Sequence, residues 1–190
     1  MLAVQHFPQE TTYYCGPATA QMILYDQGIK CTQKTLAMDN YLQTNSREET
    51  PWYITNGYRK SDFPMAYTLT VLSGISYTPM PYGYDEDIPL SPEAIRSKIV
   101  TALDADRCVA LSGVSKINKN DPSHLPGYPT EGRDRGHWLV CYGWNDITNE
   151  ALVKDPAKSE AVTWSSNIQA SYSISLEKLE AFVSAHGIIY

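Results

Sequence analysis

The sequence lacks the features of a membrane-spanning or nucleic-acid-binding protein. No apolar run approaches the ~18 residues of a membrane span, and the first residues have neither the basic nor the apolar segment of a signal peptide. The 15 Lys and Arg are outnumbered by 21 Asp and Glu, which gives a formal net charge of −6, whereas phosphate binding depends on clustered cations. We therefore expect no membrane span and no nucleic-acid partner. The compartment stays open, with secretion or delivery outside the producing cell slightly favoured.

Cysteine and histidine are too few and too scattered for a metal site. The 4 cysteines form no CxxC pair, and few of the 4 histidines lie near them, so we expect neither a metal nor an organic cofactor. If one thiol must stay free, the other three cannot all pair, which makes a disulfide framework a poor interpretation. Cys108 and Cys141 lie in apolar, strand-like runs and are expected to be small buried hydrophobic residues.

The composition that remains is that of a folded chain. Hydrophobic residues make up 43% and charged residues 19% of the 190 residues, which excludes a disordered protein. A chain of this length can bury roughly 70% of its unfolded surface, and no linker or repeat divides it, so we expect a single domain over residues 1–190. The 14 tyrosines against 3 phenylalanines favour polar-faced grooves and loops.

The predicted elements are helices first and strands later. This order indicates an α+β fold, with N-terminal helices packed on a C-terminal antiparallel sheet. Helices are expected over residues 16–25, 33–42, 64–72, from Ser91-Pro92-Glu93 onward, and over 176–185. Strands are expected over 108–114, 137–144, 150–155, 161–165 and 172–176. Loops are expected over 44–60 and 75–92.

The most informative segment is residues 9–18, QETTYYCGPA. It places Cys15 at the start of a predicted helix, where free N–H groups and the helix dipole stabilise an anion. The thiolate is the nucleophilic form of cysteine, so this position suits a catalytic residue. Gly16 and Pro17 suit a sharp entry from loop to helix. Gln9 can bring its side-chain amide to the same place, as an oxyanion hole requires.

A thiolate nucleophile needs a base, and His137 is the best placed of the histidines. The segment Arg135-Gly136-His137-Trp138 puts it at the start of a predicted strand. The other three histidines, His6, His124 and His186, are expected to be solvated or satisfied side chains.

The expected register of a β-hairpin predicts an acidic partner for this histidine. If the strands 137–144 and 150–155 pair antiparallel, residues whose numbers sum to about 292 face each other, which places His137 opposite Asp155 with Cβ atoms ~5 Å apart. A carboxylate there can fix the imidazole tautomer and stabilise the imidazolium. The simpler alternative is that Asp155-Pro156 only opens a turn.

Together these residues resemble the C39-like branch of the papain-fold cysteine peptidases. The resemblance rests on Gln9 six residues before Cys15-Gly16-Pro17-Ala18, on Gly136-His137-Trp138, and on Asp155-Pro156-Ala157. It implies a papain-like fold with Cys15 as nucleophile, His137 as base, Asp155 orienting His137, and Gln9 in the oxyanion hole. It also implies a peptide or protein substrate. The best-known relatives cut leader peptides after a Gly-Gly pair and are fused to a transporter. This chain has no transporter segment, so that substrate is not implied.

The expected function is hydrolysis of a peptide or amide bond through a thioester acyl-enzyme. Two alternatives stay open: a deamidase or acyl- or peptidyl-transferase with the same triad, and a binding module that uses the fold without catalysis. Substrate selection is expected in the segments 44–60 and 75–90 and in the long insertion before His137. The sequence does not fix the oligomeric state, and we expect a monomer.

Overall fold

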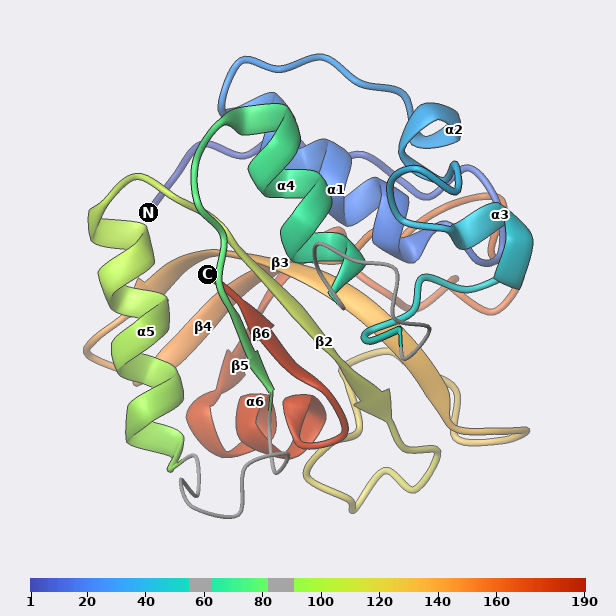
Figure 1. The fold of residues 1–190 in the computed structure, drawn as a ribbon. Helices are drawn as coiled ribbons and strands as arrows, with labels where there is room; N and C mark the ends of the chain where they lie inside the picture. The colour runs from blue at the N-terminus through green and yellow to red at the C-terminus, as the bar shows by residue number, and fades with distance from the viewer. Residues whose placement is uncertain (55–62, 82–90) are drawn as a thin grey trace.

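The computed structural model describes residues 1–54, 63–81 and 91–190, and shows helices packed against an antiparallel sheet (Figure 1). The helices are α1 (Cys15–Asp26), α2 (Gln33–Leu36), α3 (Thr44–Arg47), α4 (Pro64–Ser73), α5 (Pro92–Asp104) and α6 (Leu176–Val183). The strands are β1 (Pro79–Pro81), β2 (Val109–Ser115), β3 (Arg135–Asn145), β4 (Glu150–Lys154), β5 (Ser171–Ser175) and β6 (Gly187–Ile189). In these ranges we find no helix with the length and apolar character needed to cross a bilayer.

The strands form one sheet in the order β1-β6-β2-β3-β4-β5, and every neighbouring pair is antiparallel. The expected mixture of helices and antiparallel sheet is therefore present. β6 was not predicted, because three residues are too short for a recognisable pattern. It joins the sheet by pairing with both β1 and β2.

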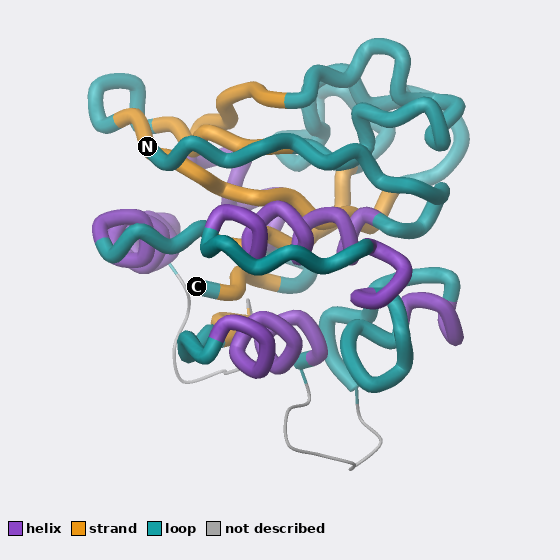
Figure 2. The backbone as a smooth tube through the Cα atoms, turned by 90° about the horizontal axis from the view of Figure 1, so that it is seen from above, coloured by secondary structure: helices purple, strands orange, loops and turns teal. Residues whose placement is uncertain are grey.

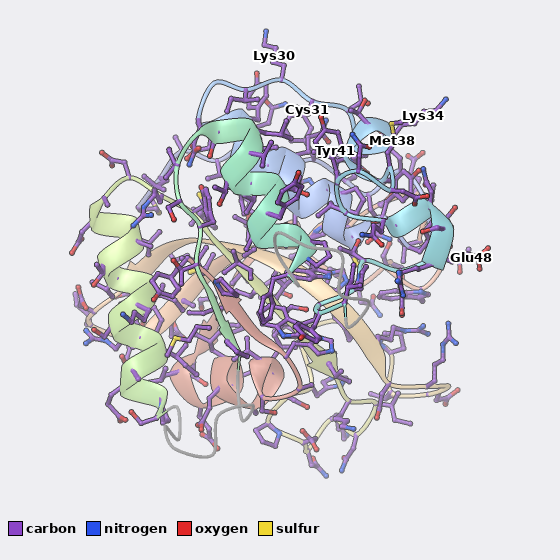
Figure 3. The ribbon with its side chains drawn as sticks, in the orientation of Figure 1. Lys30, Cys31, Lys34, Met38, Tyr41 and Glu48 are labelled. Atoms are coloured by element: carbon purple, nitrogen blue, oxygen red, sulfur yellow. The ribbon has the colours of Figure 1, made fainter. Side chains whose placement is uncertain are left out.

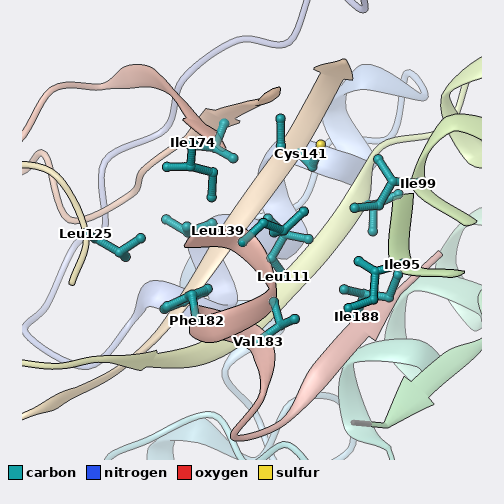
Figure 4. Close-up of a cluster of buried hydrophobic side chains, with 14 of the residues drawn as sticks. Ile95, Ile99, Leu111, Leu125, Leu139, Cys141, Ile174, Phe182, Val183 and Ile188 are labelled. Atoms are coloured by element: carbon teal, nitrogen blue, oxygen red, sulfur yellow. The ribbon is translucent and has the colours of Figure 1, made fainter. Parts of the chain in front are cut away.

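Alternating side chains of the central strands build the core on both faces of the sheet. Leu111 and Leu139 belong to the buried cluster that includes residues of α5 and α6 (Figure 4). Their neighbours Ala110 and Val140 belong to the cluster that includes residues of α1 and α4. Figure 2 shows α1 lying between the sheet and α4. The helix that begins at Cys15 is thus held in the middle of the molecule.

Three local predictions differ from the structure. The helix expected over 33–42 ends at Leu36, since turn-forming Asp39 and Asn40 follow and the chain folds back so that Leu42 N–H donates to Leu36 O over 3.1 Å. The expected loops contain the short α3 and β1, while residues 55–60 and 82–90 lie outside the described ranges. The strand expected over 161–165 is a series of turns, because its N–H groups bond locally, as Val162 N–H does to Ser159 O.

Candidate active site

The first turn of α1 presents Cys15 with free backbone donors. Tyr14 precedes the helix without a side-chain cap, and its hydroxyl donates to Asn45 Oδ1 over 2.6 Å, which fixes the entry of the chain. Pro17 has no N–H, and the N–H of Ala18 already bonds to Tyr14 O. The positive end of the helix dipole lies at this end of α1, beside the Cys15 thiol, together with those N–H groups of the first turn that have no partner within the helix.

Gly16 lets the segment that follows α3 lie directly against α1. A Cβ on Gly16 would collide with the side chain of Thr50. Thr50 is buried, hydrogen-bonded to Thr44 over 2.8 Å, and its carbonyl accepts from Trp138 Nε1 over 3.1 Å. The contact joins α1, the 44–50 segment and β3 at the position next to Cys15.

We expect Gly16→Ala to destabilise the protein by about 2 kcal/mol, because an added methyl group has no space against the buried Thr50 side chain. Gly136→Ala is a matched control: Gly136 also neighbours a site residue, but a Cβ there would meet no atom within 4 Å. Urea denaturation of both variants checks this prediction. Equal midpoints for the two variants would contradict it.

His137 and Asp155 are in direct contact below the surface. His137 Nε2 lies 2.8 Å from Asp155 Oδ1, and the two residues are 4% and 0% exposed. Burial of the ring alone would lower the pKa of His137, but the charge and hydrogen bond of Asp155, together with Cys15, outweigh it and raise that pKa to about 10. With Nε2 bonded to the carboxylate, Nδ1 is the ring nitrogen left for Cys15. The raised pKa favours the imidazolium form of a ring that lies between a carboxylate and a thiol.

The contact forms in a register different from the predicted one. Val140 pairs with Lys154 and Cys141 with Val153, so paired residue numbers sum to 294 near the site and His137 is diagonal to Asp155. Nearer the turn, Asn145 pairs with Glu150 and the sum is 295, because β3 carries one extra residue between Cys141 and Gly143. Diagonal neighbours on one face remain within reach of long side chains.

The Asp155 carboxylate accepts hydrogen bonds from four donors. Oδ1 accepts from His137 and from the N–H of Ala157 over 2.8 Å. Oδ2 accepts from the Tyr172 hydroxyl over 2.7 Å and the Tyr128 hydroxyl over 3.1 Å. Burial, followed by the charge of Asp155, raises the pKa of both tyrosines well above the usual value, so both remain donors. The buried carboxylate is therefore satisfied and fixed in orientation.

Gln9 is buried beside the same loop. It is 2% exposed, its N–H donates to Pro156 O over 2.9 Å, and its carbonyl accepts from Ser159 Oγ over 2.5 Å. The side-chain Nε2 donates one hydrogen to Thr11 O over 2.7 Å, which leaves a second N–H. Oε1 has no partner among the residues that the structure describes. Gln9 is thus tied to the segment that carries Asp155, and it lines the cleft next to Cys15.

These side chains open into a cleft of about 640 Å³. Cys15, Gln9 and His137 line it, together with Trp164 from the 155–170 segment and Trp138 from β3. Cys15 is half-buried, so its thiol is accessible from the cleft. Within the described ranges no group of three metal-binding side chains occurs.

The other cysteines have surroundings that favour the neutral thiol. Cys108 and Cys141 are buried as expected; burial and Asp26 raise the pKa of Cys108, and burial raises that of Cys141 to about 12. Burial also raises the pKa of Cys31, which lies on the segment between α1 and α2, away from the cleft (Figure 3). Cys15 is the one cysteine of the four placed beside His137.

Sequence reasoning missed several residues of the site. Tyr128 and Tyr172 carried no signal beyond the excess of tyrosine. His186 was expected to be a solvated or satisfied side chain, with no part in the site. It follows α6, which ends at Val183, and it lines the cleft with Nδ1 2.9 Å from Ser112 Oγ and its ring stacked on Trp52. His6 was expected to be solvated or satisfied, and its Nε2 lies 2.8 Å from Asp155 O.

The pKa of His137 predicts a pH dependence of stability. A histidine in the unfolded chain titrates near 6.5, and the folded value is about 10. The stabilisation is therefore complete below pH ~6.5 and is lost as the pH rises toward 10. We expect the stability difference between wild type and His137→Gln to shrink by on the order of 3 kcal/mol over this window. Urea denaturation from pH 6 to 10 measures it, and a constant difference would contradict it.

Comparison with known proteins identifies the family. The profile of the peptidase C39-like family matches residues 1–178 of the chain. The chain belongs to the peptidase C39-like family. Its fold is similar to the crystal structure of a proposed C39-like peptidase from Bacillus anthracis, with a TM-score of 0.56 and 14% sequence identity over 99% of this chain and 94% of that one. No curated protein matches the sequence significantly. The family suggests a peptidase of the cysteine type.

Proposed function

We propose that this C39-like protein hydrolyses a peptide or amide bond with Cys15 as nucleophile, His137 as acid and base, and Asp155 as the group that orients His137. The observation that carries the proposal is the buried 2.8 Å contact between His137 and Asp155 beside a half-buried Cys15 at the start of α1. Charge and geometry at this point suit a thiolate–imidazolium pair. The arrangement is consistent with a papain-like fold.

The proposed residues can carry out both acylation of Cys15 and hydrolysis of the resulting thioester. The Cys15 thiolate attacks the substrate carbonyl, and the oxyanion accepts hydrogen bonds from the Cys15 N–H and the second N–H of Gln9 Nε2. His137 Nδ1 gives its proton to the leaving amine as the C–N bond breaks, which leaves a thioester on Cys15. Neutral His137 then takes a proton from water, whose oxygen attacks the thioester. The acid product leaves, and the thiolate–imidazolium pair is restored.

The test is a search for products that depend on Cys15. Wild type and Cys15→Ala are incubated with a peptide library derived from a whole proteome, and new chain termini are identified by mass spectrometry. The proposal expects new termini with wild type only. Ammonia release without new termini would replace hydrolysis of the chain by deamidation, and joined peptides would replace it by transfer. No Cys15-dependent product of any kind would favour a binding module.

A further inference from the structure

The cleft contains two arginines that have no acidic partner. Arg133 and Arg135 both line it, and neither has an ion pair or a side-chain hydrogen bond within residues 1–54, 63–81 and 91–190. The acid between them, Asp134, is already engaged: it accepts from Lys116 Nζ over 2.8 Å and from the N–H of Ile117 over 3.0 Å. Successive side chains of an extended chain point to opposite sides. The side chains of the two arginines are therefore available to bind a group that enters the cleft.

Arg135 is held in place more firmly than a surface arginine. Its Cζ lies 4.3 Å from the centre of the Trp164 ring, and its Nε is buried without a partner in the described part of the chain. Trp164 packs on Tyr128, which contacts the His137 ring edge-on at 5.7 Å. Burial and the neighbouring charge of Arg133 lower the pKa of Arg135, although the guanidinium stays charged. A half-buried cation beside a like charge is stabilised when an anion binds.

The position of Arg135 relates it to the chemistry. It precedes His137 by two residues in β3, so the two side chains lie on the same face, roughly 7 Å apart along the strand. Glu48 and Glu49, also without ion pairs in the described ranges, line the same cleft. Glu48 lies at the end of α3 (Figure 3). The two glutamates repel an anion from their own part of the cleft. The charges therefore favour an anion at Arg135.

We propose that Arg135, supported by Arg133, forms a subsite that binds a carboxylate of the substrate close to the scissile bond. That this carboxylate belongs to a substrate rests on the proposed function, whereas the anion site itself rests on the unpaired guanidinium groups. A planar guanidinium with free N–H donors binds a carboxylate through two parallel hydrogen bonds. The carboxylate can come from an acidic side chain or from a free C-terminus, because the two groups have the same chemistry.

A test that needs no substrate uses two alkylating reagents. Iodoacetate and iodoacetamide transfer similar carbon groups with the same leaving group and differ in charge, so the ratio of their rates at Cys15 reports the local potential. We expect the rate with iodoacetate divided by the rate with iodoacetamide to fall about threefold or more in Arg135→Gln relative to wild type, and further in Arg135→Glu. Arg135→Lys keeps the positive charge, so its ratio should stay close to that of the wild type. Salt at 0.5 M should reduce the difference.

Lys30→Gln is the control, since it makes the same charge change at an exposed position remote from the cleft (Figure 3). His137 attracts iodoacetate in all of these variants, so its effect cancels. Thermal unfolding checks that wild type and Arg135→Gln are both folded. An equal ratio of the two alkylation rates in these two proteins would then overturn the subsite.

Peptides distinguish the two sources of the carboxylate. Wild type and Arg135→Glu are compared on library peptides with free and amidated C-termini. Enrichment of Asp and Glu at one position, replaced by Lys and Arg in Arg135→Glu, supports a side-chain carboxylate. Cleavage that requires a free C-terminus and loses this requirement in Arg135→Glu supports a terminal carboxylate. Cleavage with neither preference overturns the subsite. Absence of cleavage, together with a changed alkylation ratio, overturns the peptidase and supports the anion site.

Discussion

His137→Gln is expected to slow alkylation of Cys15 by iodoacetamide at pH 6 by about 100-fold or more. Intact-mass spectrometry over time measures the rate, because one adduct adds a fixed mass. An ordinary thiol with a pKa of ~8.5 is only about 0.3% ionised at pH 6. The proposed function places the His137 ring beside the sulfur, and the charge and hydrogen bond of Asp155 outweigh burial of that ring and raise its pKa to about 10. A positive charge in this position favours the reactive, ionised form of a thiol.

Two variants make this result specific. Cys15→Ala should remove the fast adduct and leave only slow labelling, because burial favours the neutral thiols of Cys31, Cys108 and Cys141. His124→Gln removes a histidine that bonds to Lys116 O and should leave the rate unchanged. If labelling of the wild type spreads over several cysteines, or is indifferent to His137, the catalytic pair does not exist in solution.

Asp155→Asn is expected to lower the same alkylation rate by about 100-fold and to destabilise the protein by about 3 kcal/mol. The amide removes the charge that keeps His137 protonated. The asparagine side chain can also accept hydrogen bonds only through its one oxygen. If this oxygen accepts from His137 and from the N–H of Ala157, the NH₂ group faces the hydroxyls of Tyr128 and Tyr172, which lose their acceptor. Buried donors that lose their acceptor cost about 1–3 kcal/mol each.

A double-mutant cycle with Tyr172→Phe tests this explanation. In the wild type, loss of the Tyr172 hydroxyl should cost about 1–2 kcal/mol, because a buried carboxylate loses a donor. In the Asp155→Asn background the same change should be nearly neutral, since the hydroxyl there has lost its acceptor. The coupling of about 1–2 kcal/mol is obtained from urea denaturation of the four proteins. Additive effects would show that Tyr172 does not act through Asp155.

The helices were predictable where local chemistry decides them. Ser91 accepts from the N–H of Ala94 at the start of α5, and Ser-Pro-Glu is a recognisable start signal. Thr32 likewise caps α2. The turn formers Asp39 and Asn40 could have indicated the early end of α2, but the path of the chain beyond it could not be predicted, because the turns bring Asn45 to the Tyr14 hydroxyl. A contact over 31 residues leaves no periodic pattern in the sequence.

The sequence by itself determined which residues could form the site: a cysteine at a helix start, a histidine at a strand start, and an aspartate at the end of the next strand. The tertiary structure decided whether they meet. The turn of the β3–β4 hairpin pairs Asn145 with Glu150. If that register continued unchanged, His137 and Asp155 would lie on opposite faces of the sheet. The extra residue of β3 between Cys141 and Gly143 shifts the pairing by one. Because side chains alternate along a strand, this bulge returns both residues to one face, two positions from the predicted register.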